Sequence, residues 1–540
     1  MATRRRKATP RGERALFVLV LLAVIAILFA RLGTAPLADV DEGAFSEATR
    51  EMLVRGDLVS PWLLDAPRFD KPVLFHWLQM PFIVLLGAEP LAARLPSALA
   101  GLASVLAVAA WAWSLSGRDL LAAAFGASIA STSLAVPVIA RVATADATLN
   151  ALLAIALLAS WHALFTRQQV HARRFARVAA AAIALGLLAK GPIALLVPAI
   201  CVPLAAWWSA RGARLGHLLL DPIAWALLVL LALPWYLLQW RAMGAAFIDG
   251  FFGTHNVGRF LAPMHGFDHG PGYYPIVLLL ALLPWTTLLV RAVAGALRDP
   301  SHPFRDRAFG LAWIPAVFVL LFFSFSATKL PHYLFYGIGG LFAALGALAA
   351  GMSRSDARFG WERAVCGVML IACASLPWWW PSVADAIPDA FHRQAARDAA
   401  VVLGGYRAWL VGLGCAGLAI AVLAPARQAV LGAATVLAIA LHLVVVPAGL
   451  AGLQDPVVAA AERVAHLRTR VITWRLDVPS LSFAAGRVVR AGDPAIGDTV
   501  VLRVDRRDAL AQALAGGTPR ASLRMQWRMG GIEIAEVVAR

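Results

Sequence analysis

Lysine is rare in this chain, and its positions suggest a site for phosphate. Among 48 lysine and arginine residues only Lys7, Lys71, Lys190 and Lys329 are lysines, so arginine is the default cation. The last three lie at or close to Gly or Pro turn signals, in FDKPV, LLAKGP and ATKLPHY. A compact ammonium binds phosphate as a point charge where a planar guanidinium would not fit. We therefore expect Lys71 to contact phosphate; for all three, a side chain that extends along the membrane surface is the alternative.

Carboxylates form a second group of candidates. Most of them lie in one segment, at Asp39, Asp41, Glu42, Glu47, Glu51, Asp57, Asp65 and Asp70. Asp146 stands apart at the head of an apolar segment, where a carboxylate is costly and more often functional than on a soluble surface. A helix N-terminus also stabilises acids, which gives Asp146, Asp41 and Glu42 a purely structural alternative.

Histidines suggest a metal site less clearly. His255, His265 and His269 lie in one segment together with Asp268, and their spacing matches no zinc pattern. One hypothesis is a divalent cation held by Asp70 and His255 across two loops. The alternative is a loop histidine bonded to backbone groups.

These residues belong to a chain with the composition of a membrane protein. It has 540 residues, of which 60% are hydrophobic and 15% charged, and a mean hydropathy of +0.73. We predict thirteen spans, at residues 15–32, 91–116, 119–138, 146–165, 178–190, 192–209, 218–239, 273–294, 309–324, 334–350, 364–380, 401–424 and 428–448. An odd number places a cytoplasmic N-terminus and the C-terminal tail on opposite sides of the membrane.

Loop charges support this topology. Arginines collect in the short loops assigned to the cytoplasm, as the positive-inside rule requires, which also explains most of the net charge of +17 without nucleic acid. None of these loops contains a Gly-rich phosphate cradle, so we expect no nucleotide cofactor. The long loops that carry the candidate residues are all assigned to the outside, where nucleotide sugars and ATP are not available. A group-transfer enzyme placed there needs an activated donor already carried across, and a lipid phosphate fits both the lysines and the apolar surroundings.

Two domains follow from this organisation: a transmembrane domain over residues 1–449 and a periplasmic domain over 450–540. The first periplasmic loop contains two apolar-periodic stretches, Glu42–Arg55 and Lys71–Leu86, that predict helices lying along the membrane interface. The four cysteines fall inside predicted spans and indicate neither a disulfide framework nor a zinc cluster.

Several segments together resemble the PMT-type glycosyltransferases. They are DVDEGAFSEATREMLVRGDLVSPWLLDAPRFDKPVLFHWL, ARLPSALAG, RVATADATLNALLAIAL, LLAKGPIALLVP, HNVGRF, GYYPIVLLLALLPW and ATKLPHYLF. Within that superfamily the chain is similar to the 4-amino-4-deoxy-L-arabinose lipid A transferases. The resemblance implies an all-α polytopic protein of GT-C fold with about thirteen transmembrane helices and a small α/β periplasmic C-terminal domain. It also implies an inner-membrane enzyme that transfers a sugar from undecaprenyl phosphate to lipid A or another envelope acceptor.

The same resemblance assigns roles to individual residues. It implies that Asp41, Glu42 and Asp146 are catalytic, and that Lys71 holds the carrier phosphate with Tyr333 close by. Lys329, in the same motif as Tyr333, is a further candidate for that phosphate. Asp70 falls where these enzymes usually have Glu, and His255 falls where the family supplies a metal contact.

The chain departs from the family pattern beside these positions. Ala44 and Phe45 replace a usual Arg-Tyr pair, and Arg68 stands where the aminoarabinose enzymes tend to have Tyr. We hypothesise that Arg68 replaces the lost positive charge and contributes to the carrier-phosphate site.

Two other classes of protein fit parts of the sequence. A transporter would fit the many spans, but it would place its acids at mid-membrane instead of at one face. An enzyme of the same fold that glycosylates protein, in the manner of an O-mannosyltransferase, or that acts on lipid-linked glycans, fits every residue named.

Overall fold

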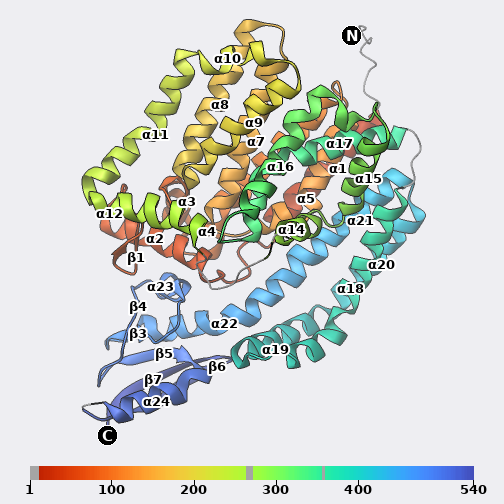
Figure 1. The fold of residues 1–540 in the computed structure, drawn as a ribbon. Coiled ribbons are helices and arrows are strands. Elements are labelled where there is room, and N and C mark those ends of the chain that lie inside the picture. Colours follow the sequence, from red (N-terminus) through yellow and green to blue (C-terminus); the bar gives the residue numbers. More distant parts are fainter. Residues whose placement is uncertain (1–10, 263–269, 271, 355–358, 518) are drawn as a thin grey trace.

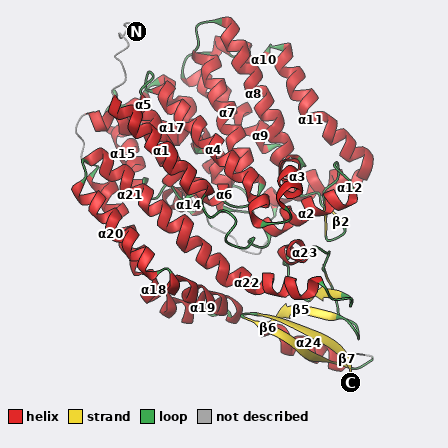
Figure 2. Cartoon of the chain, turned by 180° about the vertical axis from the view of Figure 1, so that it is seen from behind, coloured by secondary structure: helices red, strands yellow, loops and turns green. Residues whose placement is uncertain are grey.

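The computed structural model describes residues 11–262, 270, 272–354, 359–517 and 519–540, most of which are helical. Figure 1 shows long helices packed side by side in one body, with a small sheet at the C-terminal end of the chain. Helix α22 (Val446–Ala465) runs from the long helices to that sheet. Figure 2 shows the same arrangement from behind.

Within the described residues, seven helices are long and apolar enough to cross a membrane. They are α1 (Arg11–Phe29), α4 (Pro90–Leu115), α7 (Ala145–Phe165), α11 (Pro222–Met243), α16 (Gly310–Ser324) with its preceding turn, α18 (Gly360–Asp385) and the continuous segment Ala426–Ala465, made of α21 (Ala426–Ala440), η6 (Leu441–Val445) and α22. The chain is therefore a multi-pass membrane protein.

Three pairs of consecutive helices meet the same test only when each pair is taken together. Bends of 115°, 64° and 67° separate α14 (Tyr273–Ala281) from α15 (Thr286–Arg298), η5 (Pro331–Gly337) from α17 (Gly339–Arg354), and α19 (Ala390–Gly405) from α20 (Arg407–Leu423). With these pairs the described residues contain up to ten candidate spans.

The prediction of thirteen spans is thus confirmed only in part. Every predicted range contains a helix, but α5 (Leu120–Thr132) and α9 (Ile193–Trp208) are shorter than a bilayer requires. The range 178–190 belongs to α8 (Gln169–Lys190), whose first half carries several arginines. Short helices complete this part of the chain: α6 (Ala135–Ala140), η1 (Gly212–Arg214), α10 (Gly216–Leu219), α12 (Ala245–Phe247), η2 (Ile248–Gly258), α13 (Arg259–Leu261), η3 (Pro303–Arg305) and η4 (Arg307–Phe309).

The segment between α1 and α4 contains the two helices that its apolar periodicity predicted. They are α2 (Asp41–Arg55) and α3 (Leu74–Leu86), separated by a small hairpin of β1 (Trp62–Leu63) and β2 (Ala66–Pro67). Two acids in the first turn favour the start of α2, and Gly56 in the left-handed conformation ends it. Buried apolar side chains from α2, α3 and α4 form a cluster that also contains residues at the start of α7, and we call it the cluster beneath α2.

The C-terminal part is the predicted small α/β unit. Its strands are β3 (Val471–Thr473), β4 (Arg490–Ala491), β5 (Thr499–Arg503), β6 (Ala521–Met529) and β7 (Ile532–Ala539), in the order β4-β3-β5-β7-β6. Strand β3 pairs in parallel with β4 and β5, whereas β7 pairs antiparallel with β5 and β6. The helices are α23 (Pro479–Ala485) and α24 (Arg507–Gly516), with η7 (Val504–Arg506) between β5 and α24. The boundary predicted at residues 449/450 falls inside α22, which is continuous there.

Candidate active site

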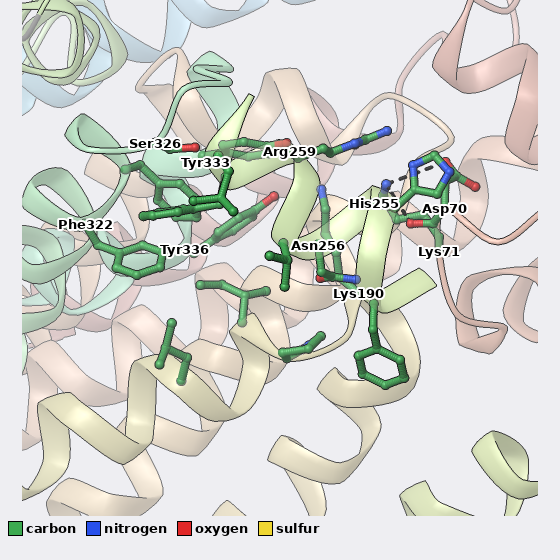
Figure 3. A pocket seen from close by; sticks show the side chains of 18 residues that line it. Asp70, Lys71, Lys190, His255, Asn256, Arg259, Phe322, Ser326, Tyr333 and Tyr336 are labelled. Atoms are coloured by element: carbon green, nitrogen blue, oxygen red, sulfur yellow. Dashed lines mark hydrogen bonds and ion pairs between the residues drawn. The ribbon is translucent and has the colours of Figure 1, made fainter. Parts of the chain in front are cut away.

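A cavity of about 360 Å³ brings together residues from four segments that are distant in the sequence. Its polar lining comes from the turn after β2, the end of α8, η2 with α13, and the segment from the end of α16 to η5: Asp70, Lys71, Lys190, His255, Asn256, Arg259, Ser326, Tyr333 and Tyr336. Its apolar lining includes Ile193, Leu196, Phe260, Phe322 and Phe323. Figure 3 shows Asp70, Lys71 and His255 at one end and Phe322 at the other. The cavity is therefore polar at one end and apolar along the remainder.

Three cations line this cavity: Lys71, Lys190 and Arg259. The Lys71 ammonium donates to the Asp70 carbonyl oxygen at 3.1 Å and lies 3.6 Å from the Asp70 carboxylate. Burial, together with the neighbouring cations, lowers the pKa of Lys71 to about 8, and the attraction of Asp70 opposes this shift. Cations held so close together repel one another, so the site favours an anion between them.

Asp70 is held mainly by Arg68. Arg68 Nε lies 2.6 Å from Asp70 Oδ1, and its Nη2 donates to Oδ2 at 3.0 Å. Burial alone would raise the pKa of Asp70, but the charges of Arg68 and Lys71 hold it well below its usual range. The Arg68 side chain is buried with its guanidinium 4.5 Å from the Phe45 ring centre. Arg68 is not among the residues that line the cavity, so it stands behind Asp70 on the side of α2.

Asp146 joins three helical elements by its carboxylate. It forms an ion pair with Lys190 at the end of α8, accepts a hydrogen bond from the Tyr336 hydroxyl at 2.9 Å, and lies 3.7 Å from His332 Nε2. Thr144 is the N-cap residue of α7, and the Asp146 carboxylate points to these neighbours. The structural alternative from the sequence, a simple helix cap, does not describe this arrangement.

The segment from Leu37 to Gly43, which we call the Asp41 loop, leads into α2 and presents Asp41 and Glu42 differently. Asp41 is exposed, and it lies close enough to His332 for its charge to act on that ring. Glu42 is 2% exposed. Its carboxylate accepts two hydrogen bonds from Arg94 at 2.8 Å and two more from the backbone amides of Ala38 and Ala143. Glu42 therefore has the contacts of a structural residue, whereas Asp41 is open to solvent.

The structure separates the other candidates. Tyr333 lines the cavity, but Lys329 does not. Arg259, which the sequence reasoning did not select, is in the wall one helical turn after His255, and Tyr336 lies three residues after Tyr333. Both were detectable as same-face neighbours of residues already selected.

A metal at Asp70 and His255 would find an incomplete set of ligands. Asp70 Oδ1 is paired by charge with Arg68 Nε at 2.6 Å, although not in hydrogen-bond geometry, whereas His255 Nδ1 is buried without a hydrogen-bond partner among the described residues. No group of three or more His, Cys, Asp or Glu side chains suited to a metal occurs in the described part of the chain, and His265, Asp268 and His269 lie outside it. Because two cations already neutralise the Asp70 carboxylate, the described residues do not fit a divalent ion, and no step below uses one.

Comparison with known proteins places these residues in a family context. The family described as dolichyl-phosphate-mannose-protein mannosyltransferase (PMT) matches residues 15–245, which include the Asp41 loop, Lys71, Asp146 and Lys190. The chain belongs to the PMT family. Its PMT relatives include the undecaprenyl phosphate-alpha-4-amino-4-deoxy-L-arabinose arabinosyl transferase of Pectobacterium carotovorum, 33% identical over 58% of this chain and 56% of that protein. Arabinosyl transferase 1 of Sodalis glossinidius is 31% identical over 66% of both chains. The chain thus matches little more than half of the first relative's length.

Nearly the whole chain resembles a solved structure in fold. ArnT from Cupriavidus metallidurans, bound to undecaprenyl phosphate, superposes with a TM-score of 0.78 over 97% of this chain and 98% of that chain, at 22% sequence identity. The C-terminal sheet unit is therefore part of a shared architecture.

Proposed function

We propose that this protein transfers 4-amino-4-deoxy-L-arabinose, or a related sugar, from undecaprenyl phosphate to lipid A or another envelope acceptor. The observation that carries the proposal is the cavity itself, in which Lys71, Lys190 and Arg259 gather at one end of an apolar wall. A polyprenyl phosphate presents the complementary pair of features, an anion at the end of a hydrocarbon chain. The arabinosyl transferase names of the relatives and the undecaprenyl phosphate bound by ArnT support the same donor.

The charge at this end of the cavity suits the leaving group better than the donor. Lys71, Lys190, Arg259 and Arg68 face two carboxylates, Asp70 and Asp146, so two positive charges remain uncompensated among the described residues. The donor phosphodiester carries one negative charge, whereas a phosphate monoester carries about 1.5 to 2 at neutral pH. Interactions that strengthen as charge develops on the phosphate lower the barrier.

The proposed reaction is an inverting displacement. An acceptor oxygen attacks the anomeric carbon, the bond from that carbon to the phosphate oxygen breaks, and its electron pair remains on the departing polyprenyl phosphate. Asp41 orients the acceptor and, if the acceptor is a hydroxyl, receives its proton. A lipid A phosphate is already ionised and would need no base.

The departures from the family pattern bear on the sugar or the acceptor. Phe45 and Arg68 lie behind Asp70 and do not line the cavity proposed for the carrier. A protein or lipid-linked glycan acceptor therefore remains the second candidate. Membership of a glycosyltransferase family argues against a transporter.

We also propose the location and orientation of the enzyme. Arginine-rich short loops place the N-terminus in the cytoplasm, and the Asp41 loop, the cavity and the C-terminal unit on the periplasmic side of the inner membrane.

Mass spectrometry of lipid A tests the proposal. We expect a pentosamine-sized addition in cells with the wild-type gene, and its loss both on deletion and in Asp41→Asn. Asp249→Asn, an exposed substitution on η2 outside the cavity lining, is the matched control and should keep the addition. Lipid A unchanged by deletion would reject this acceptor, and a fully active Asp41→Asn would reject the role of Asp41.

A further inference from the structure

Helix α23 connects the C-terminal unit to the Asp41 loop through two hydrophobic clusters. Leu481 is buried in the core of the C-terminal unit. Phe483 is 3% exposed and packs in the other direction, into the cluster beneath α2 that also contains Phe45 and Ala145. Ala145 precedes Asp146, so this one cluster supports both proposed catalytic carboxylates. Figure 1 shows α23 next to α2, between the long helices and the sheet.

A polar contact joins the same two parts at Asp39. The Ser480 backbone amide donates to Asp39 Oδ1 at 2.9 Å, and the Ser480 hydroxyl donates to Oδ2. Gln454 on α22, with its amide oriented to satisfy both partners, donates to Oδ2 at 3.1 Å and accepts from the Asp39 backbone amide at 3.0 Å. Four hydrogen bonds thus fix a residue that lies two positions before Asp41.

Close packing beside this contact leaves no room for the loop to shift. A Cβ atom on Gly43 would lie 2.3 Å from Asp39 Oδ1 and 2.5 Å from the Ser480 nitrogen, far inside normal contact. The first turn of α2 therefore rests directly on the start of α23.

We propose that Ser480 and Gln454 are positioning residues for the reaction: by holding the Asp39 carboxylate, they fix the Asp41 loop, and with it Asp41 near His332, so that the C-terminal unit forms part of the active-site scaffold. This inference rests on the proposed function, because it takes Asp41 as the residue that must be placed. It assigns the C-terminal unit a direct part in turnover.

The chemistry of the contact predicts which substitutions it tolerates. Burial raises the pKa of Asp39 to about 7, against the hydrogen bonds of Ser480, and the carboxylates of Asp477 and Glu42 add to the rise. A neutral, protonated acid is therefore accommodated. Asp39→Asn keeps one oxygen that accepts from the Ser480 backbone amide, but its NH2 group faces the Gln454 donor, so it should weaken the contact less than Asp39→Ala does. Asp39→Ala removes every acceptor that the side chain offers, and Ser480→Ala removes the hydroxyl donor, whereas Ser480→Thr retains it.

Ser482→Ala provides a matched control on the same helix. The Ser482 hydroxyl is buried and exchanges hydrogen bonds with Val489 inside the C-terminal unit, without contact to the Asp41 loop. This substitution perturbs the unit by a comparable amount but leaves Asp39 held.

Two measurements on full-length protein test the proposal. Hydrogen exchange of the peptide spanning residues 37–45 should be faster in Ser480→Ala and Asp39→Ala than in the wild type, intermediate in Asp39→Asn, and unchanged in Ser480→Thr and Ser482→Ala. In transfer assays with the lipid-linked donor, kcat should fall about tenfold or more in the first two variants while the donor KM stays constant.

The outcomes separate this inference from the proposed function. If Ser480→Ala and Ser482→Ala are indistinguishable in exchange and in kcat, the positioning role is overturned. If Ser480→Ala speeds exchange of the loop but Asp41→Asn is fully active, the contact exists and the assignment of Asp41 fails instead.

Discussion

Arg68→Ala should impair sugar transfer by releasing Asp70. In the intact site Arg68 binds both oxygens of the Asp70 carboxylate, at 2.6 and 3.0 Å. Without Arg68, the ion-pair partner left to that carboxylate among the described residues is Lys71, 3.6 Å away. Lys71 would then pair with Asp70 instead of the carrier phosphate, and the cavity would lose one of its two uncompensated positive charges.

The expected size of the effect follows from the burial of the pair. Leaving one member of a fully buried pair without its partner costs about 3–5 kcal/mol. The Asp70 side chain is 18% exposed and keeps Lys71, so we take about 1.5–3 kcal/mol, the range for a hydrogen bond to a charged group. If that cost falls on the transition state, kcat/KM drops roughly ten- to a hundredfold.

A double-mutant cycle distinguishes this indirect role from direct contact with phosphate. We would measure kcat/KM for the lipid-linked donor in Arg68→Ala, Asp70→Asn and the double variant. If Arg68 acts by neutralising Asp70, the double variant should recover most of the activity that Arg68→Ala loses. A double variant no better than Arg68→Ala would refute this reasoning, and a fully active Arg68→Ala would remove Arg68 from the site.

Three further predictions concern the same region. Because the pKa of Lys71 is lowered to about 8, its ammonium loses a proton as pH rises through 8, and the donor KM should then increase. Lys71→Arg should remove this dependence of the donor KM on pH. If the donor KM of Lys71→Arg still rises near pH 8, another group causes the rise. Glu42→Gln leaves a buried arginine without its anion, so it should lower the unfolding temperature of the purified protein, at a cost of about 3–5 kcal/mol; normal stability with lost turnover would instead make Glu42 catalytic. Gly43→Ala should push α2 away from Ser480 and speed hydrogen exchange in its first turn, whereas Gly351→Ala, with open space around it, should not; equal exchange in both would contradict the packing described here.

The sequence predicted the helices well and the span count poorly, for one physical reason. Apolar composition reports which segments avoid water, and each predicted range does contain a helix. Composition does not report bends, and the range 273–294 is two helices that meet at 115°. Composition also does not report helix length, and α9 is an apolar helix of only 16 residues, shorter than the helices that meet the test for a span.

The candidate site was predictable where residue type restricts function. Lys71 and Asp146 stood out because a charge near the bilayer needs a reason, and both have specific ionic partners in the structure. Lys329 was selected by the same argument and does not line the cavity. The partners themselves were not predictable: that Asp146 reaches Lys190, or Asp39 reaches Ser480, depends on how segments 44 and 441 residues apart fold together.

The continuous segment Ala426–Ala465 has 40 residues, so at 1.5 Å per residue it is about 60 Å long. Gln454 belongs to this helical segment, so the direction in which its side chain points around the helix axis depends on the number of residues that precede it. One inserted residue before Gln454 would turn its side chain by about 100° and lift it by about 1.5 Å, away from Asp39. Seven inserted residues would restore the direction but raise it by about 10 Å. Chimaeras that exchange C-terminal units between relatives should therefore be active only when the junction leaves the number of residues in this helical segment unchanged.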